Sequence, residues 1–143
     1  MIGVVKGLTR DELFTVTATL SDNVEITGAF GDKLVVSVLT AMECVGVKGV
    51  GIHFSGEPKD GLSAGLAIWA AIYSMARGFD FGDVAMTGVI DSEGNVLKVG
   101  GIAGKLSKAD CPVYVPVGNE NDVANCGGTA TFIENVKDLE GEI

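Results

Sequence analysis

The chain has 143 residues, a length typical of one domain and enough to bury roughly two-thirds of the surface of the unfolded chain. Lysine and arginine number 10 against 19 aspartates and glutamates, so the net charge is -9. This acidity argues against binding to nucleic acid and favours solubility, with a weak preference for a basic substrate. We therefore expect a single domain over residues 1–143 with no nucleic-acid partner.

Features of membrane, metal and cofactor proteins are missing from the sequence. The longest strongly apolar run, which begins at Leu66, is too short to span a membrane, and the N-terminus lacks the regions of a signal peptide. The three cysteines, Cys44, Cys111 and Cys126, lack Cys-x-x-Cys spacing, which disfavours a disulfide framework or a zinc site. The pattern Gly-x-x-x-x-Gly-Lys-Ser/Thr is absent as well. We expect a cytoplasmic protein with no membrane association, no cofactor, no metal and no ATPase domain.

The first half of the chain is predicted to begin with strands. Residues 1–8 form one strand, and residues 14–20 alternate apolar side chains with threonines, the period of a half-buried strand. A polar turn then leads into residues 24–27, which we expect to pair with the preceding strand as a hairpin. A helix follows through about Val45, with Asp32 as its cap, because apolar residues recur along one side of it.

Strands and helices alternate in the second half. A strand over 50–54 precedes a helix over 66–76 that is apolar on nearly every side and is therefore expected to be buried, with Gly78 as its C-cap. The other expected elements are a hairpin of strands 84–90 and 96–99, a short helix at Lys105, strands 113–117 and 129–133, and helical segments 120–126 and 136–139. This order predicts an α+β (mixed α/β) domain, with several short sheets packed around a buried central helix.

The entrance of the buried helix is suited to holding an oxyanion. The first turn of a helix has four backbone N–H groups without intrahelical partners, and here they follow Asp60, Gly61 and Ser63. A glycine lets the backbone turn sharply, so Ser63 would be a nucleophile that faces donors for a developing negative charge. Ser63 could instead be a simple N-cap, and Asp60 either a cap or a regulator of the oxyanion site.

A serine nucleophile needs a base, and the chain offers few. The only histidine, His53, lies in an alternating apolar strand, where a structural role is expected. A lysine can serve if burial keeps it neutral. Lys105 meets this condition best because it follows the apolar segment 96–104, although it could also be a solvated lysine. Lys59 is expected to be a charged, solvated loop residue.

Three blocks of sequence resemble the signature blocks of the Lon protease proteolytic domain, in the same order and at nearly the same spacing. They are Pro58-Lys-Asp-Gly-Leu-Ser-Ala-Gly65, Asp83-Val-Ala-Met-Thr-Gly88 and Val99-Gly-Gly-Ile-Ala-Gly-Lys105. The resemblance covers the whole chain. It implies that Ser63 is the nucleophile, Lys105 the general base and Thr87 a hydroxyl that positions the lysine, and that the domain associates into rings of six.

Several positions depart from the family pattern. Leu62 stands where the family usually has proline, Val89 where it has glutamate and Ala103 where it has lysine. The acidic residue common on the second strand is Thr17 here. These departures leave the predicted serine and lysine pair in place, and they bear on the substrate groove and on coupling to partners.

The sequence thus predicts an ATP-independent serine endopeptidase that hydrolyses peptide bonds of unfolded proteins or peptides through a Ser-Lys dyad and an acyl-enzyme. Asp60 and Gly61 would support the oxyanion site. Substrate would lie extended beside the strand that ends near Phe54, in contact with Glu57 and Pro58. The alternative is a non-catalytic Lon-like assembly module, or a protease subunit that works with a separate ATPase. Expected partners are a protein or peptide substrate and further copies of this chain.

Overall fold

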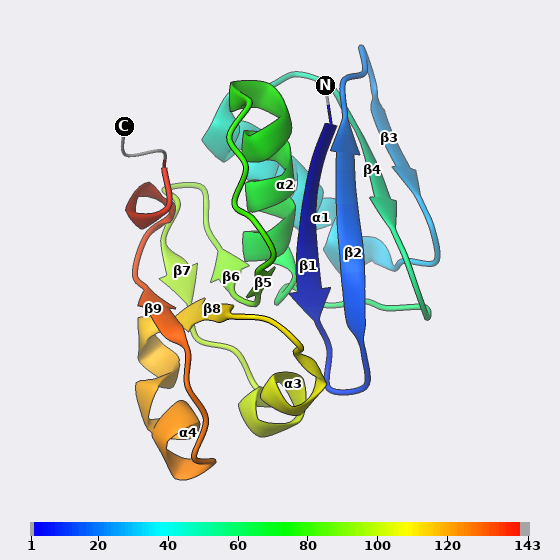
Figure 1. The fold of residues 1–143 in the computed structure, drawn as a ribbon. Coiled ribbons are helices and arrows are strands. Elements are labelled where there is room, and N and C mark those ends of the chain that lie inside the picture. The colour runs from blue at the N-terminus through cyan, green and yellow to red at the C-terminus, as the bar shows by residue number, and fades with distance from the viewer. Residues whose placement is uncertain (1, 141–143) are drawn as a thin grey trace.

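The computed structural model describes residues 2–140, which fold around one seven-stranded sheet (Figure 1). Its strands follow the order β3-β4-β2-β1-β5-β8-β9. Their bounds are β1 (Ile2–Leu8), β2 (Leu13–Thr19), β3 (Val24–Thr27), β4 (Val50–Phe54), β5 (Ala85–Met86), β8 (Val113–Pro116) and β9 (Thr131–Ile133). A second sheet pairs β6 (Val89–Ile90) with β7 (Val96–Leu97). The helices are α1 (Asp32–Val45), α2 (Gly65–Arg77), α3 (Ile102–Lys108) and α4 (Glu120–Asn125), with 3-10 turns η1 (Val117–Asn119) and η2 (Val136–Asp138).

The predicted mixed α/β class is confirmed. The large sheet combines antiparallel pairs, such as β1 with β2, and parallel pairs, such as β1 with β5. In place of several short sheets, the described residues form one large sheet and one small one, because β5, β8 and β9 continue the sheet that β1 and β2 begin. The arrangement brings Leu8 at the end of β1 into one apolar cluster with residues from Ala85 to Val123, which follow much later in the sequence.

Helix α2 is the buried central helix that the sequence predicted. Every residue from Leu66 to Ile72 is buried, and the helix packs against α1, β1 and β2. It ends at Gly78, whose φ of 66° lets its N–H donate to the carbonyl of Ser74, as expected for a glycine C-cap. Because α2 is surrounded by the core, the residues at its N-terminus have little freedom to move.

The hairpin predicted between residues 14–20 and 24–27 is wrong. Strand β4 lies between β2 and β3, antiparallel to the first and parallel to the second. Buried side chains alternate along β4 at Val50, Ile52 and Phe54, whereas β3 is mostly exposed. The more apolar strand therefore takes the inner position, and β3 becomes the edge of the sheet.

The prediction that Asp32 caps α1 is also wrong. Gly31 is the N-cap of this helix and makes no side-chain hydrogen bond. The carboxylate of Asp60 accepts from the backbone N–H groups of Lys33 at 2.9 Å and Leu34 at 3.3 Å instead. The free N–H groups of the helix are thus satisfied by a residue 27 positions away from Lys33, which a local sequence pattern does not reveal.

The strand predicted over 84–90 is two short strands, β5 and β6, separated by Thr87 and Gly88. The expected antiparallel partner of β6, β7, is present. At the break, the N–H of Gly88 donates to the carbonyl of Ser63 at 2.8 Å, and the N–H of Leu66 donates to the carbonyl of Gly88 at 2.9 Å. The break therefore holds Thr87 and Gly88 against the entrance of α2.

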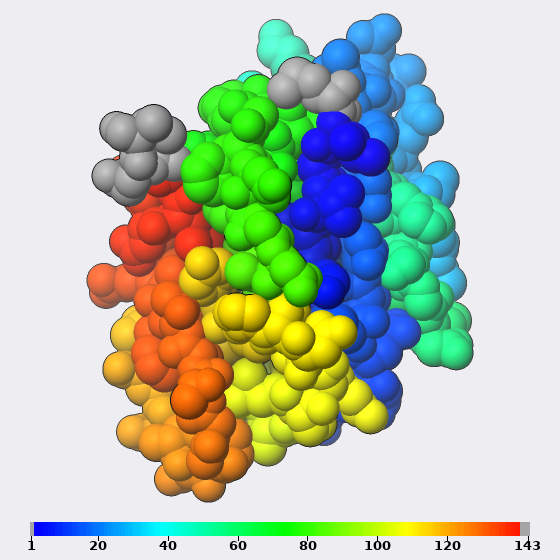
Figure 2. Space-filling view, in the orientation of Figure 1, coloured from blue at the N-terminus to red at the C-terminus, as the bar shows by residue number. Residues whose placement is uncertain are grey.

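A second apolar cluster joins the later part of the chain to the end of β1. It includes Leu8 of β1, Ile102 of α3 and Val115 of β8. Figure 2 shows this later part, coloured yellow to orange, in contact with the green and blue segments that precede it. The cluster fixes α3, which carries Lys105, beside the end of β1.

Candidate active site

A cleft of about 480 Å³ contains the predicted serine and lysine. The end of β1, the start of α1, the loop before α2, the β7–α3 segment and α3 all contribute to its walls. The residues that line it are Thr9, Arg10, Lys33, Asp60, Leu62, Ser63, Val89, Lys98, Val99, Gly100 and Lys105. The fold thus brings Ser63 and Lys105, which are 42 positions apart in the sequence, to one cavity.

Ser63 lies in the turn before α2 and is held by its backbone. Its carbonyl accepts from the N–H of Gly88 at 2.8 Å. Gly61, two residues earlier, has a φ of 149°, which side chains rarely tolerate, so glycine is required for this turn. The N-cap of α2 is Ala64, and no side chain caps the helix. The Ser63 hydroxyl is therefore not engaged in capping, the simpler role that the sequence left open.

Lys105 is buried in the middle of α3, with 5% of its surface exposed. Its amine donates to the Thr87 hydroxyl at 3.0 Å, and this hydroxyl lies 3.5 Å from the Ser63 carbonyl, to which it donates. Burial, with a smaller contribution from repulsion by the Arg10 guanidinium, lowers the pKa of Lys105 from 10.5 to about 8. A substantial fraction of this amine is therefore neutral, and able to accept a proton, in mildly alkaline solution.

Arg10 is a cleft residue that the sequence reasoning missed. It follows β1 in the turn to β2, and its side chain lies against Gly101 and Gly104 of the α3 region. Gly101, the N-cap of α3, has a φ of 71°, and a Cβ there would come within 2.4 Å of Arg10 Nε. The Gly100-Gly101 pair was visible in the sequence, but nothing local indicated that it accommodates an arginine from 90 residues earlier.

Asp60 lines the cleft, but its carboxylate points to α1. One oxygen accepts from the N–H groups of Lys33 and Leu34. The sequence left two roles open for Asp60, a helix cap or a regulator of the oxyanion site. In the structure Asp60 caps a helix, and this helix is α1, not α2. This contact connects the start of α1 to the loop that carries Ser63.

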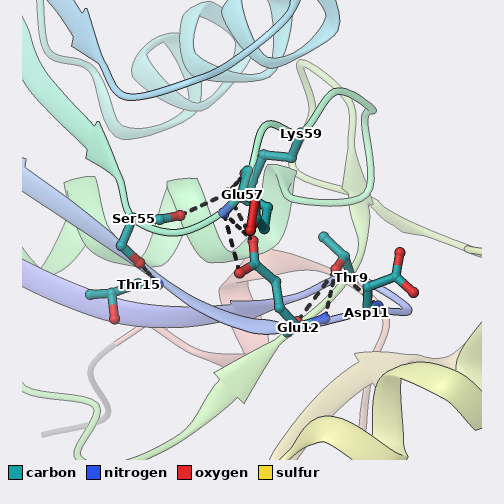
Figure 3. A network of polar contacts seen from close by, with 7 residues as sticks. All are labelled: Thr9, Asp11, Glu12, Thr15, Ser55, Glu57 and Lys59. Carbon is teal, nitrogen blue, oxygen red and sulfur yellow. Dashed lines mark hydrogen bonds and ion pairs between the residues drawn. The ribbon is translucent and has the colours of Figure 1, made fainter.

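The loop before Ser63 is anchored to the β1–β2 turn by a polar network (Figure 3). The amine of Lys59 forms an ion pair with Glu12 at 3.1 Å and donates to the carbonyl of Ser55 at 2.7 Å. Glu12 also accepts from the backbone N–H of Glu57. Only 6% of the Lys59 side chain is exposed, so the prediction of a solvated lysine is wrong. The buried Lys59 amine is paired with the Glu12 carboxylate and donates to the carbonyls of Ser55 and Glu57.

The three predicted substrate contacts lie away from the cleft lining. Phe54 is 1% exposed and belongs to the core, whereas Glu57 and Pro58 are exposed on the loop after β4. A peptide cannot add as a strand along Val50–Phe54, because β2 and β3 occupy both edges of β4. His53 also lies outside, where its ring contacts the Thr27 hydroxyl at 2.8 Å.

Asn119 supports the lysine side of the cleft and was not found from the sequence. It is fully buried, its carbonyl oxygen accepts from the N–H of Val99, and its amide group donates to the Val99 carbonyl at 2.8 Å. The side chain thus pairs with the segment before α3 as a neighbouring strand would. This pairing fixes Val99 and Gly100, which line the cleft next to Lys105.

The described part of the chain has neither a cluster of metal-ligating side chains nor a membrane-spanning helix. Within residues 2–140, no three or more His, Cys, Asp or Glu side chains lie close enough together to hold a metal ion. None of the helices in the same range is both long and apolar enough to cross a membrane.

Comparison with known proteins identifies the family. Residues 1–132 match the model of the Lon protease (S16) C-terminal proteolytic domain. The Lon protease of Finegoldia magna is 30% identical over 99% of this chain, which covers 23% of that protein. The Lon protease of Haemophilus influenzae is 34% identical over 97% of this chain and is covered to 19%. The chain therefore spans about a fifth of the length of these relatives. It belongs to the family of Lon protease C-terminal proteolytic domains.

Proposed function

We propose that this domain is a serine endopeptidase that hydrolyses peptide bonds of unfolded proteins or peptides without ATP, with Ser63 as nucleophile and Lys105 as general base. The observation that carries the proposal is the buried Lys105 amine, whose pKa is lowered to about 8 in the cleft that also contains Ser63. A surface lysine would remain charged and could not accept the serine proton near neutral pH.

The first half of the reaction forms an acyl-enzyme. Neutral Lys105 takes the proton of the Ser63 hydroxyl while Ser63 Oγ attacks the carbonyl carbon of the substrate. Backbone N–H groups in the turn that contains Gly61 and Ser63 would stabilise the oxyanion. When the tetrahedral intermediate collapses, the C–N bond breaks, and Lys105 passes its proton to the leaving amine. The acyl group of the substrate is then esterified to Ser63.

The second half releases the product. A water molecule loses a proton to Lys105 and attacks the ester carbonyl. Collapse of the second tetrahedral intermediate breaks the bond to Ser63 Oγ, which recovers the proton from Lys105, and the product leaves as a carboxylic acid. Thr87 acts as a positioning residue, because its hydroxyl accepts from the Lys105 amine at 3.0 Å and directs that amine in the cleft.

Partners of the proposed peptidase are expected from its family. We expect further copies of this chain, associated in a ring of six, and a separate ATPase that unfolds larger substrates. Large apolar side chains are exposed on β1, where Ile2 is 62% and Val4 50% exposed, which favours association of this surface. A mass near that of six chains in light scattering is the expected result. A monomer with full peptidase activity would contradict the need for a ring.

Incubation with unfolded casein tests the proposal. The wild-type protein should degrade casein without ATP, and Ser63→Ala should lose at least about a thousandfold in rate while it remains folded. Ser92→Ala, in an exposed turn, is the matched control and should retain activity. Wild-type cleavage by Ser63→Ala would contradict the assignment of the nucleophile. No cleavage by the wild type would favour the non-catalytic assembly module.

A further inference from the structure

The cleft is positively charged although the protein is strongly acidic. Its lining includes four basic residues and one acidic residue, whereas the whole chain has 10 basic and 19 acidic residues. The basic residues are Arg10, Lys33, Lys98 and Lys105, and the acidic one is Asp60, so three cations remain in the lining when Lys105 is neutral as the proposed base. The balance of charge around Ser63 is therefore opposite to that of the molecule.

The exposed cations of the cleft lining do not form ion pairs with acidic side chains in the described residues. The Asp60 carboxylate is already bonded to backbone N–H groups at the start of α1. Among residues 2–140, the ion pairs involve Lys6 and Lys59, and neither Arg10 nor Lys98 has an acidic partner within 4 Å. The exposed cations of the cleft are thus available to a ligand.

Arg10 is the exposed cation of the cleft that lies closest to the segment carrying Lys105. Its side chain rests against the glycines at the start of α3, next to Gly100 and on the wall that carries Lys105. A guanidinium can donate two parallel hydrogen bonds to one carboxylate, which an ammonium group cannot match in geometry. Lys33 and Lys98 line the cleft as well and add to the positive potential.

We propose that the cleft selects peptides that carry a carboxylate close to the scissile bond, with Arg10 as the specificity-determining residue. This inference rests on the proposed peptidase function and replaces the weak preference for basic substrates suggested by the net charge. The carboxylate can be an acidic side chain or the C-terminus of the peptide, because both present the same group to Arg10. In either case, attraction to the cleft should weaken as salt screens the charges.

The test uses matched quenched fluorescent peptides that differ at one residue beside the scissile bond, Glu, Gln or Lys, each with a C-terminal acid or amide. The wild type should cleave the Glu peptide about tenfold better in kcat/KM than the Gln peptide, and the Lys peptide least well. Arg10→Gln should reduce the difference between Glu and Gln to about twofold, and Arg10→Lys should restore part of it. Lys48→Gln, an exposed residue outside the cleft, makes the same change in net charge and should preserve the preference.

Comparing the acid and amide forms of each peptide shows whether the recognised carboxylate is the peptide C-terminus or a side chain. If the acid form is preferred whichever residue stands beside the bond, Arg10 recognises the chain end. If the preference follows Glu in the amide peptides, it recognises a side chain. Equal kcat/KM for all peptides with wild type, or a preference that survives Arg10→Gln, would overturn the proposal and leave the peptidase function intact.

Binding to Ser63→Ala distinguishes failure of this inference from failure of the proposed function. Fluorescence anisotropy with labelled forms of the peptides should give a Kd about tenfold lower for the Glu peptide at low salt, and Arg10→Gln in the same background should abolish the difference. Tighter binding of the Glu peptide without any cleavage by wild type would refute the peptidase function alone. Equal binding of the three peptides would refute recognition by Arg10.

Discussion

Replacing Lys105 with methionine should stabilise the protein at neutral pH and should stop doing so at alkaline pH. The lysine amine is buried in the folded protein and solvated in the unfolded chain, so folding disfavours its charged form. Methionine keeps a similar apolar stem without the charge. The variant thus removes the penalty for burying a cation, and this penalty depends on pH in a way that follows from the two pKa values.

The structure sets the size of the effect. Burial and repulsion by Arg10 lower the pKa of Lys105 from 10.5 to about 8, and since one pKa unit corresponds to about 1.4 kcal/mol, the charged lysine costs about 3 kcal/mol in the folded state. The folded pKa is the lower one, so the penalty is complete below about pH 8, decreases toward pH 10.5 and vanishes above it. Methionine also loses the hydrogen bond to Thr87, about 1 kcal/mol. We expect a net gain of about 2 kcal/mol near neutral pH.

Urea unfolding followed by the fluorescence of Trp69, the only tryptophan, measures this difference at neutral pH and near pH 10.5. The other charged groups of the cleft, Arg10, Lys33, Lys98 and Asp60, are the same in both proteins. The exposed Lys48→Met is the control and should change the free energy of unfolding by less than about 0.5 kcal/mol at either pH. A stability difference for Lys105→Met that does not vary with pH would show that the charge on buried Lys105 does not oppose folding.

Two other substitutions test the contacts around the site. Thr87→Val removes the acceptor of the Lys105 amine and should lower kcat by about 10- to 100-fold. Thr87→Ser keeps a hydroxyl and should retain most activity. Equal kcat for both variants in a peptide assay would contradict the positioning role. Lys59→Met removes the cation that pairs with Glu12 and the donor to the Ser55 carbonyl, while Glu12 keeps its hydrogen bond from the N–H of Glu57. It should destabilise the fold by about 2 to 3 kcal/mol in urea unfolding. Combining it with Glu12→Gln should destabilise by less than the sum of the single changes, and strict additivity would show that the pair is not coupled.

The parts of the fold around the site that the sequence predicted correctly are those encoded by adjacent residues. The apolar run from Leu66 indicates a buried helix, and Gly61 in the turn before Ser63 and Gly78 at the C-cap are required by local backbone geometry. The break between β5 and β6 at Thr87 and Gly88 was missed, because apolar strand residues flank it on both sides and only its contact with Ser63 explains it.

Features that depend on distant partners could not be read from the sequence. Strand β3 pairs with β4, which comes more than 20 residues later, so the turn after β2 gave the wrong partner. Asp60 caps a helix that begins 28 residues earlier, and Lys59 is buried only because Glu12 is there to pair with it. Arg10 reaches the cleft through the position of β1 beside α3, which no local pattern records.

The most direct test of the central claim is covalent labelling by a fluorophosphonate, which reacts with activated serine hydroxyls, followed by mass spectrometry of the protein. A Ser-Lys dyad predicts a single adduct on Ser63. Its rate of formation should rise with pH through about 8, the pKa of Lys105, and the adduct should be lost in Lys105→Met. An adduct on another serine, or labelling of Ser63 at the same rate in Lys105→Met, would contradict the dyad.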